Sequence, residues 1–320
     1  MHEFEMIRDY FRPLTMDRAE AGGLLDDAAV LEIPRDFDLV MSSDTLNSGV
    51  HFMDNESPAN IAHKCLRVNL SDMAAMGAKP YCYQLNIAFA NMPKEDWVKE
   101  FTDALMADQK EFGIFCSGGD TTVTEGGLLV SMTITGLVPR GKAVKRYGAK
   151  QGDFIVLTGD IGDAGIGVNV MLGVLKLDDP AHFLNACHRP VARTAISDIV
   201  QKYAHAAIDI SDGLISDLSH ICSVSEVGAK VEAEKVPLSY AARNLLDKGL
   251  VTFEDLFTGG DDYELALAVP PEKFETFKVE ASKRGVDVSA VGVFEAGEGV
   301  SVINASGEAL EFDQQGWTHF

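Results

Sequence analysis

Apolar residues repeat along this chain with two different periods, and the alternation between them constrains the fold more than any other feature. Between Tyr81 and Phe89 every second residue is apolar, as on one face of a β-strand. The segment 58–76 instead follows the helical period; Ser57 is an N-cap residue before it, and Gly77 lies where a helix commonly ends. Both halves of the chain mix the two patterns, which is typical of α/β and α+β proteins.

These patterns predict a chain of two α/β domains. The turn at residues 139–141 separates them, so we expect an N-terminal domain of residues 1–140 and a C-terminal domain of residues 141–320. Because no low-complexity tract or long linker lies between the halves, the two domains should pack against each other. We predict helices at residues 4–11, 58–76, 93–113 and 212–224, and strands at residues 29–33, 38–43, 81–89, 114–117, 128–138, 154–158, 206–210 and 263–269.

The acidic composition excludes several classes of partner. The chain has 27 basic and 49 acidic residues, a formal net charge of -22, whereas nucleic acids and anionic membranes bind clustered lysine and arginine. A phosphorylated small molecule stays compatible with this charge if metal ions mediate the contact. The five cysteines are widely spaced and never form a Cys-x-x-Cys pair, which indicates buried thiols. With no signal-peptide pattern and no apolar run near the length of about 20 residues that a membrane span needs, we expect a soluble, cytoplasmic protein.

Acidic residues lie next to Gly, Ser or Thr at the ends of predicted strands in five places. Loops beyond strand ends commonly bind ligands in α/β proteins, and carboxylate and hydroxyl oxygens are the hard ligands that Mg²⁺ prefers. Taken one at a time, each motif is also explained as an ordinary turn or helix N-cap of an acidic chain. The motifs are Asp26-Asp27, Ser42-Ser43-Asp44 and residues 118–121, 209–213 and 259–262.

Asp72 is harder to explain as a turn residue. On the predicted helix 58–76 it shares a stripe with Cys65 and Val68, and a buried carboxylate is costly unless it is paired or bound to a metal. Arg67 lies off that stripe, so a metal site is favoured over a structural hydrogen bond. Several carboxylates in one place repel each other unless divalent cations lie among them, which predicts an Mg²⁺–polyphosphate ligand.

Other phosphate-binding patterns fit poorly. Residues 136–143 nearly match a P-loop, but Ala143 stands where the Ser or Thr that binds Mg²⁺ is required. The glycines of residues 159–167 are out of step with the dinucleotide-binding pattern Gly-x-Gly-x-x-Gly, so this loop is either a tight turn or a place of phosphate approach. The spacings typical of zinc sites, EF-hands and serine hydrolases do not occur.

In this order and at this spacing, the motifs resemble those of the thiamine-monophosphate kinase family, which belongs to the superfamily of aminoimidazole ribonucleotide synthetase. Any one motif could arise by chance, whereas the ordered set points to the family. The resemblance covers almost the whole chain, from Asp26 to Phe320. Its most specific stretches are residues 69–77, 118–122, 208–217 and 259–265.

The resemblance implies an N-terminal ATP- and Mg²⁺-binding domain whose sheet pairs with that of a second subunit in a homodimer, followed by a mixed α/β C-terminal domain. ATP would lie between the domains. Family positions that hold several Mg²⁺ ions match Asp27, Ser42, Ser43, Asp44, Asp72, Asp120, Asp209 and Asp212. Positions that contact ATP match Gly119, Asp120, Arg146 and Ser211, and positions that contact thiamine monophosphate match His51, Asp261 and Trp317.

The family activity is ATP-dependent phosphorylation of thiamine monophosphate to thiamine diphosphate. Its nucleophile is a phosphate oxygen that is largely ionised at neutral pH, so catalysis needs in-line alignment and charge neutralisation rather than a general base. We expect Asp72, Asp120 and Arg146 to carry catalysis, and Trp317 to stack on the substrate. Two alternatives stay open: a sister ATP-using synthetase of the same superfamily, and a catalytically silent nucleotide- or metal-binding protein.

Three positions depart from the family pattern. Leu25 stands where glycine usually precedes the paired aspartates, and leucine lacks the backbone freedom of glycine. Ser43 replaces the commoner threonine but keeps the hydroxyl oxygen. Asp261 replaces the usual glutamate, which shortens the reach toward substrate by one methylene. These departures leave open the path of the loop near Asp26 and the role of Asp261.

Overall fold

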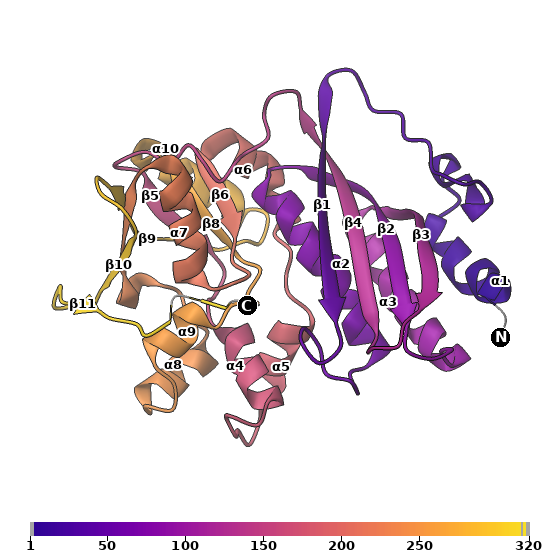
Figure 1. Ribbon diagram of the computed structural model, residues 1–320. Coiled ribbons are helices and arrows are strands. Elements are labelled where there is room, and N and C mark those ends of the chain that lie inside the picture. Colours follow the sequence, from indigo (N-terminus) through magenta and orange to yellow (C-terminus); the bar gives the residue numbers. More distant parts are fainter. Residues whose placement is uncertain (1–2, 315, 318–320) are drawn as a thin grey trace. The chain divides into compact units, whose positions relative to one another are not determined.

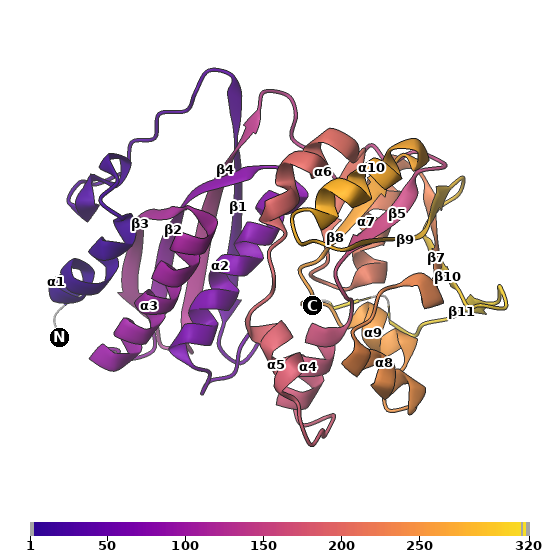
Figure 2. The same ribbon diagram turned by 180° about the vertical axis from the view of Figure 1, so that it is seen from behind.

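The computed structural model describes residues 3–314 and 316–317. The chain divides into two compact units, which are described separately below (Figure 1; Figure 2 from behind). The N-terminal unit comprises Met1–Met73 and Lys79–Gly141, and the C-terminal unit comprises Ala74–Ala78 and Lys142–Phe320. Among the described residues, every helix is too short or too polar to cross a membrane.

A four-stranded sheet forms the centre of the N-terminal unit, with strand order β1-β4-β2-β3. Neighbouring strands are antiparallel except β2 and β3, which are parallel. The long helices α2 and α3 cover one face of this sheet (Figure 2). The segment before β1 forms short helical turns that contact β3. The bounds are α1 Glu3–Met6, η1 Ile7–Phe11, η2 Arg12–Thr15, η3 Ala19–Leu24, β1 Phe37–Asn47, α2 Pro58–Ala75, β2 Lys79–Phe89, α3 Glu95–Phe112, β3 Phe115–Val123 and β4 Leu129–Pro139.

Local signals at both ends of α2 act as the sequence predicts. The Ser57 hydroxyl accepts the backbone N–H of Asn60 at 3.2 Å, which is the hydrogen bond of an N-cap. Gly77, just beyond the helix, has φ +66°, a left-handed conformation that glycine adopts without steric cost. Cys65 and Val68 on the predicted apolar stripe are buried, so this helix packs as its periodicity indicates.

One strand prediction for the N-terminal unit is wrong, and two predicted strands are too short. Residues 29–33 form an irregular segment instead of a strand. The strands predicted at 38–43 and 114–117 both continue further, so residues 42–44 and Asp120 lie inside strands rather than at strand ends. Hydrophobic periodicity underestimated the length of both strands because they contain polar residues. A strand that is buried on only one face tolerates polar side chains on the other face.

A seven-stranded mixed sheet forms the centre of the C-terminal unit, with strand order β11-β10-β7-β9-β5-β8-β6. The predicted strand 154–158 is confirmed as β5, and its side chains alternate between two hydrophobic cores. Ile155 and Leu157 face one core, to which α7 and α9 contribute, whereas Val156 faces the other, to which α6 and α10 contribute. A strand buried on both faces is a continuous apolar run, which explains why the sequence marks it clearly.

The remaining elements belong to the C-terminal unit, where the strands form this sheet and the helices pack around it. The strands are β5 Phe154–Thr158, β6 Ala206–Asp209, β7 Gly228–Glu232, β8 Leu265–Val269, β9 Val288–Glu295, β10 Val300–Ile303 and β11 Ala309–Leu310. The helices are α4 Asp163–Met171, α5 Ala181–His188, η4 Thr194–Ile196, α6 Ser197–Tyr203, α7 Leu214–Ser225, η5 Ala233–Lys235, α8 Tyr240–Asp247, α9 Phe253–Thr258 and α10 Pro271–Ser282.

Strand direction brings three sequence motifs to one end of the C-terminal sheet. Strands β5 and β6 both run antiparallel to β8, which lies between them. The ends of β5 and β6 therefore lie beside the start of β8. The loops at residues 159–162 and 210–213 follow the first two strands, and the loop at residues 259–264 precedes the third. Residues that are distant in the sequence thus lie together at one end of the sheet.

Candidate active site

In the N-terminal unit, a serine and two aspartates meet between β1 and α2. Ser42 and Asp44 are two residues apart on β1 and therefore project from the same face of the sheet. The Ser42 hydroxyl donates a hydrogen bond to Oδ2 of Asp72 on α2 at 2.5 Å. The charges of Asp44 and Asp72 also act on each other. Three of the predicted metal ligands are thus brought together by one strand and one helix.

The protonation of Asp44 reflects this arrangement. Burial and, second, the negative charge of Asp72 raise the pKa of Asp44 to about 7. Two neighbouring, partly buried carboxylates are stabilised by a shared proton or by a cation. The Ser42 hydroxyl and both carboxylates offer oxygen atoms, which Mg²⁺ prefers over nitrogen or sulfur. The chemistry of this donor set therefore fits the predicted Mg²⁺.

Ser43 and Asp120 lie on the opposite face of the same sheet. In the strand register Ser43 is opposite Thr133, which is opposite Gln84 on β2, and Asp120 is opposite Asn86. The Thr133 hydroxyl donates to the Ser43 hydroxyl at 3.1 Å, which places both on one face. Because Gln84 and Asn86 are two residues apart, they share that face with Ser43 and Asp120. The sheet therefore separates the predicted N-terminal ligands into two groups.

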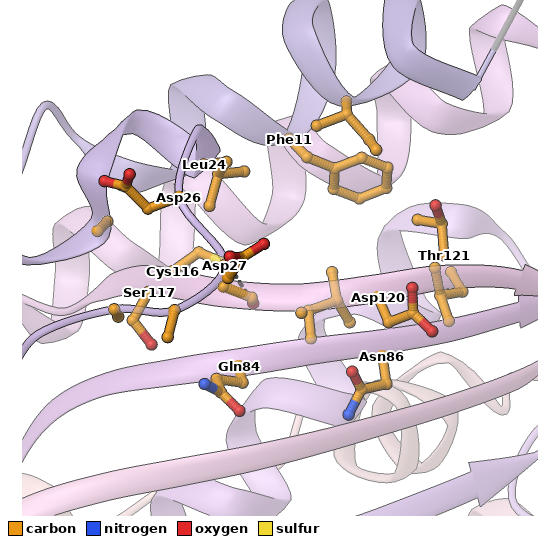
Figure 3. A pocket seen from close by; sticks show the side chains of 18 of the residues that line it. Phe11, Leu24, Asp26, Asp27, Gln84, Asn86, Cys116, Ser117, Asp120 and Thr121 are labelled. Carbon is orange, nitrogen blue, oxygen red and sulfur yellow. Dashed lines mark hydrogen bonds between the residues drawn. The ribbon is translucent and has the colours of Figure 1, made fainter.

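Asp120 and Asp27 line one pocket, which has a volume of about 370 Å³ (Figure 3). Asp27 comes from the loop before β1, and Asp120 comes from β3. The loop passes over the strands, so that the amides of Gln84 and Asn86 also line the pocket (Figure 3). The pocket thus combines carboxylate oxygens, which bind cations, with amide groups, which both donate and accept hydrogen bonds.

The loop that carries Asp27 obtains its shape from residues ahead of Leu25. Gly22 and Gly23 adopt φ +56° and +63°, and Leu24 follows at φ +58°. Leu25 itself has φ -109°, which leucine reaches without strain. The glycine that the family pattern has at this position is therefore not needed for the observed backbone path.

Gly119 is required by strand packing. Its φ is +154°, and a Cβ atom there would lie 1.8 Å from the backbone oxygen of Leu85 on β2. A side chain at this position would have to separate β2 from β3. This geometric reason for glycine is independent of the ATP contact that the resemblance implies, and that contact stays a prediction.

His51 has a defined tautomer. Its Nδ1 accepts the backbone N–H of Asn47 at 3.0 Å, so the proton of the neutral ring is on Nε2. Asn47 is the last residue of β1, and the turn that follows this strand therefore fixes the imidazole. The predicted contact of His51 with substrate is not tested by this geometry.

In the C-terminal unit, backbone hydrogen bonds join the loops that carry four predicted residues. Asp261 N–H donates to the carbonyl of Ser211 at 2.8 Å, and Trp317 N–H donates to the carbonyl of Asp212 at 2.9 Å. The Trp317 side chain is 55% exposed. Asp209, the last residue of β6, is buried directly before this loop. The structure thus gathers five predicted residues, from the end of β6, the β6–α7 loop, the loop before β8 and the C-terminal segment.

The conformation of Asp261 bears on its departure from the family pattern. Asp261 has φ +67°, a left-handed conformation that aspartate tolerates better than most other residues. The Cys187 thiol of α5 donates to Asp261 Oδ2 at 3.3 Å. Cys187 is a neighbour that sequence patterns did not reveal, because the contact joins residues far apart in the chain. Its place beside a predicted substrate residue follows from the fold alone.

Asp217, which sequence patterns did not single out as a site residue, is buried on α7. Its Oδ2 accepts the backbone N–H groups of Ser211, Asp212 and Gly213 at 3.0, 3.0 and 3.2 Å. Burial and, second, the charge of Asp212 raise the pKa of Asp217 to about 7. An available signal was its place in the first turns of a helix that directly follows Asp212-Gly213, where side chains reach back to loop N–H groups.

Asp262 makes a similar contact at the start of α4. Its two carboxyl oxygens accept the N–H of Gly162 at 3.0 and 3.1 Å. Burial raises the pKa of Asp262 well above its usual range. Because a side chain of the protein already occupies this helix start, the glycine-rich residues 159–167 are better explained as a tight turn than as a phosphate site.

Arg146 is exposed on the segment beside the edge strand β6. The preceding residue, Lys145, accepts the N–H of Ala207 at 3.0 Å, and the carbonyl of Arg146 accepts the Ser225 hydroxyl at 3.5 Å. The backbone of Arg146 is thereby attached to the unit that carries Asp209. The guanidinium contact with ATP stays a prediction.

Sequence comparison identifies relatives for the whole chain. Residues 25–138 match the model of AIR synthase related protein, N-terminal domain, and residues 150–304 match that of AIR synthase related protein, C-terminal domain. The chain is 39% identical to a thiamine-monophosphate kinase of Caulobacter vibrioides, over 99% of this chain and 90% of that one. It is 37% identical to a thiamine-monophosphate kinase of Escherichia coli, over 99% of this chain and 98% of that one.

Solved structures agree with the sequence relatives. The crystal structure of thiamine-monophosphate kinase from Stenotrophomonas maltophilia has a TM-score of 0.85 and 36% identity, and the match covers 95% of this chain and 97% of that one. The complex of AaThiL with AMPPCP and TMP has a TM-score of 0.79 and 29% identity, over 99% of this chain and 97% of that one. Sequence and fold therefore agree that the chain belongs to the thiamine-monophosphate kinase family of AIR synthase related proteins.

Proposed function

We propose that this protein transfers the γ-phosphoryl group of ATP to thiamine monophosphate and so forms thiamine diphosphate and ADP. The observation that carries the proposal is the full-length similarity to a protein solved in complex with AMPPCP, an ATP analogue, and TMP. Thiamine-monophosphate kinases at 37–39% identity over 99% of the chain support the same activity. We also propose a cytoplasmic location, which the five buried free thiols support, because thiols stay reduced in that compartment.

The proposed reaction places two anions in contact. A phosphate oxygen of thiamine monophosphate attacks the γ-phosphorus of ATP, and the bond from that phosphorus to the β-phosphate oxygen breaks as ADP leaves. The second pKa of a phosphate monoester is about 6, so the attacking oxygen is already ionised at neutral pH. The protein must therefore align the two phosphates in line and neutralise their charge, and it does not need to remove a proton.

Mg²⁺ supplies that neutralisation when it is bound, by drawing charge from the phosphate oxygens. The proposed ligands form three groups, because the N-terminal sheet separates Ser42, Asp44 and Asp72 from Ser43, Asp27 and Asp120. The third group is Asp209 and Asp212 beside the end of β6. This division supports several separate Mg²⁺ ions rather than one cluster of carboxylates.

The substrate contacts are proposed from residues in both units. Arg146, Ser211, Gly119 and Asp120 would contact ATP, and His51, Asp261 and Trp317 would contact thiamine monophosphate. The exposed indole of Trp317 supports a stacking role, since a cation–π contact with the thiazolium requires an accessible ring. Asp72, Asp120 and Arg146 would carry the phosphoryl transfer.

We also propose the homodimer that the family resemblance implies. Leu39 and Met41 on β1 are 38% and 62% exposed. They alternate with the residues that face α2 and so lie on the other face of the N-terminal sheet. Apolar side chains on an exposed sheet face support pairing with the same face of a second copy. Sedimentation analysis of the wild type against Met41→Glu tests this surface, and a monomeric wild type would reject it.

The activity is tested by incubation of the protein with Mg²⁺, ATP and either thiamine or thiamine monophosphate. We expect thiamine diphosphate from the monophosphate alone, together with one equivalent of ADP. Consumption of ATP with a different acceptor would instead favour a sister synthetase of the superfamily. Binding of Mg²⁺ and ATP without turnover of any acceptor would favour a catalytically silent binder.

A further inference from the structure

A carboxylate of α7 holds the loop that carries Ser211 and Asp212. Asp217 is 2% exposed, and one of its oxygens accepts three successive backbone N–H groups, those of residues 211–213. Successive N–H groups that converge on one point form a concave site for an anion. In this loop a side chain of the protein fills that site.

The filled site determines what the loop can offer to a ligand. The three N–H groups are no longer donors for an incoming phosphate, and the side-chain oxygens of Ser211 and Asp212 belong to the class of atoms that bind cations. An Asp212 oxygen and an Asp217 oxygen lie within 4.8 Å of each other. The loop is thereby suited to a nucleotide that arrives with metal ions.

In a second loop at the same end of the sheet, a backbone N–H group is also paired with a carboxyl group of the protein. Asp262 accepts the N–H of Gly162 at the start of α4, so this helix start is also occupied by a carboxyl group of the chain. Two loops at this end of the sheet, which follow β5 and β6, thus have backbone N–H groups paired inside the protein. This repetition is independent of the bonds that Asp217 makes.

We propose that Asp217 is a positioning residue of the kinase reaction, because its bonds to residues 211–213 hold Ser211 and Asp212 in the geometry that binds Mg²⁺–ATP. The inference rests on the proposed function. Asp217 acts through the loop backbone, so the position of its acceptor oxygen matters more than its charge. Three variants separate position from charge. Asp217→Asn keeps an acceptor oxygen without the charge, Asp217→Glu keeps the charge but moves it, and Asp217→Ala removes both.

We expect the value of kcat/KM for ATP to follow acceptor position. Loss of a residue that orients metal or substrate ligands costs about 10- to 100-fold, so Asp217→Ala and Asp217→Glu should fall by that factor. Asp217→Asn should stay within about fivefold of the wild type, since its amide oxygen still accepts N–H groups. Added formate should partly restore Asp217→Ala, because the small carboxylate fits the vacated site.

The matched control is Asn304, whose side-chain oxygen accepts the backbone N–H groups of Ser306 and Glu308 at 3.0 and 2.9 Å. It holds a turn of the same unit between β10 and β11, outside the proposed site. Asn304→Ala should lower the melting temperature but leave both kcat and KM within twofold. A purely structural role of Asp217 predicts this same pattern for Asp217→Ala.

A second readout does not need turnover. The backbone N–H of Trp317 is bonded to Asp212, so movement of the loop changes the environment of this indole. In a Trp97→Phe background, Trp317 is the remaining tryptophan of the two in the chain. Asp217→Ala should change its acrylamide quenching and weaken Mg²⁺–ATP binding about tenfold or more, whereas Asp217→Asn should do neither.

Two results would overturn the proposal. One is wild-type kcat/KM and Mg²⁺–ATP affinity in a folded Asp217→Ala or Asp217→Glu protein. The other is a folded Asp217→Asn protein as impaired as Asp217→Ala, since the charge rather than the acceptor position would then matter. If the wild type makes no thiamine diphosphate, the proposed function fails, and nucleotide binding with Trp317 quenching still decides the role of Asp217.

Discussion

Helix α2 contributes to two acidic sites with opposite electrostatics. Along α2, His63 Nδ1 lies 2.9 Å from Asp108 Oδ2 of α3, and Arg67 Nη2 lies 2.7 Å from Asp108 Oδ1. Burial alone would raise the pKa of Asp108, but the hydrogen bonds from His63 and Arg67 outweigh it and lower the pKa. Near the end of the same helix, burial and, second, the negative charge of Asp72 raise the pKa of Asp44 to about 7.

The difference separates a carboxylate that is neutralised inside the protein from one that is proposed to bind a metal ion. Burial acts in the same direction on both groups, because it raises the pKa of the buried Asp108 and of the partly buried Asp44, so burial does not separate them. Their partners do, because Asp108 is surrounded by donors of the protein whereas Asp44 lies beside a second acid. The first arrangement stabilises the empty protein, and the second is stabilised by a proton or by an added cation.

The largest expected effect is that of Asp72→Asn on activity. If Asp72 helps to hold Mg²⁺, its neutralisation should reduce kcat by about a thousandfold, which corresponds to several kcal/mol of charge stabilisation. The melting temperature should stay equal or rise, because repulsion with Asp44 is removed. Steady-state formation of thiamine diphosphate and a thermal melt measure both quantities. Near-normal turnover would contradict the metal role of Asp72.

Asp108→Asn should behave in the opposite way. Removing the negative partner of a buried ion pair leaves Arg67 with less compensation and costs about 3 kcal/mol of unfolding free energy. Chemical denaturation should detect that loss, while kcat of the folded protein at low temperature stays within a few-fold of the wild type. A stable but inactive Asp108→Asn protein would contradict the assignment of a structural role to Asp108.

The pH dependence should also differ between the two sites. Because the pKa of Asp44 is raised to about 7, the proton that Mg²⁺ must displace is bound below that pH. Mg²⁺ affinity should therefore rise about tenfold per pH unit up to pH 7 and then level off. Calorimetric titration at pH 6, 7 and 8 measures this slope. A slope that persists unchanged in Asp44→Asn would assign the proton to another group.

Stability without metal should follow the signs of the same shifts. A raised pKa means that the folded state holds the Asp44 proton more tightly than the unfolded chain, so this contribution is lost as pH rises from about 4 to 7. Asp108 has a lowered pKa, so its contribution is present above about pH 4 and is lost as pH falls through the lowered value. Denaturation of Asp44→Asn between about pH 4 and 7, and of Asp108→Asn below about pH 4, measures the two contributions to the free energy of unfolding separately.

The smallest expected effect is that of Ser42→Ala. The hydroxyl donates to Asp72, and loss of a hydrogen bond to a charged group costs about 1.5–3 kcal/mol when nothing replaces it. Since water reaches this partly buried site, we expect a decrease in kcat/KM of about fivefold. Thr45→Ala is the matched control on the same strand, because its hydroxyl donates to the Ser131 hydroxyl at 2.9 Å and neither residue is a proposed ligand. An equal loss in Thr45→Ala would show that the effect is not specific to the hydroxyl beside Asp72.

Sequence patterns predicted the parts of the fold that are buried on two sides. Residues 154–157 are all apolar and the segment 154–158 was recognised as a strand, and the cap at Ser57 marked the start of α2. The strand lengths around residues 42–44 and 118–121 were predicted too short. Polar side chains interrupt the apolar pattern of both strands, so hydrophobic periodicity does not report their full length.

The order of the motifs identified the family, but it did not give the arrangement of their side chains. Ser42, Ser43 and Asp44 are adjacent in sequence, yet the two-residue period of a strand sends the middle one to the other face. Asp217 was overlooked because its bonds run from a helix back to a loop, and that geometry depends on how the helix begins. The three-dimensional arrangement, and not the residue type, determines the face on which each of residues 42–44 lies and the contacts that Asp217 makes.

The tight approach at Gly119 has a consequence for genetic data. Any replacement places an atom against the Leu85 carbonyl, so the two strands cannot stay together. In a survey of mutant alleles, replacements of Gly119 would be poorly tolerated even if this residue made no contact with ATP. Defects that arise there should accordingly be traced to lost protein before they are attributed to lost catalysis.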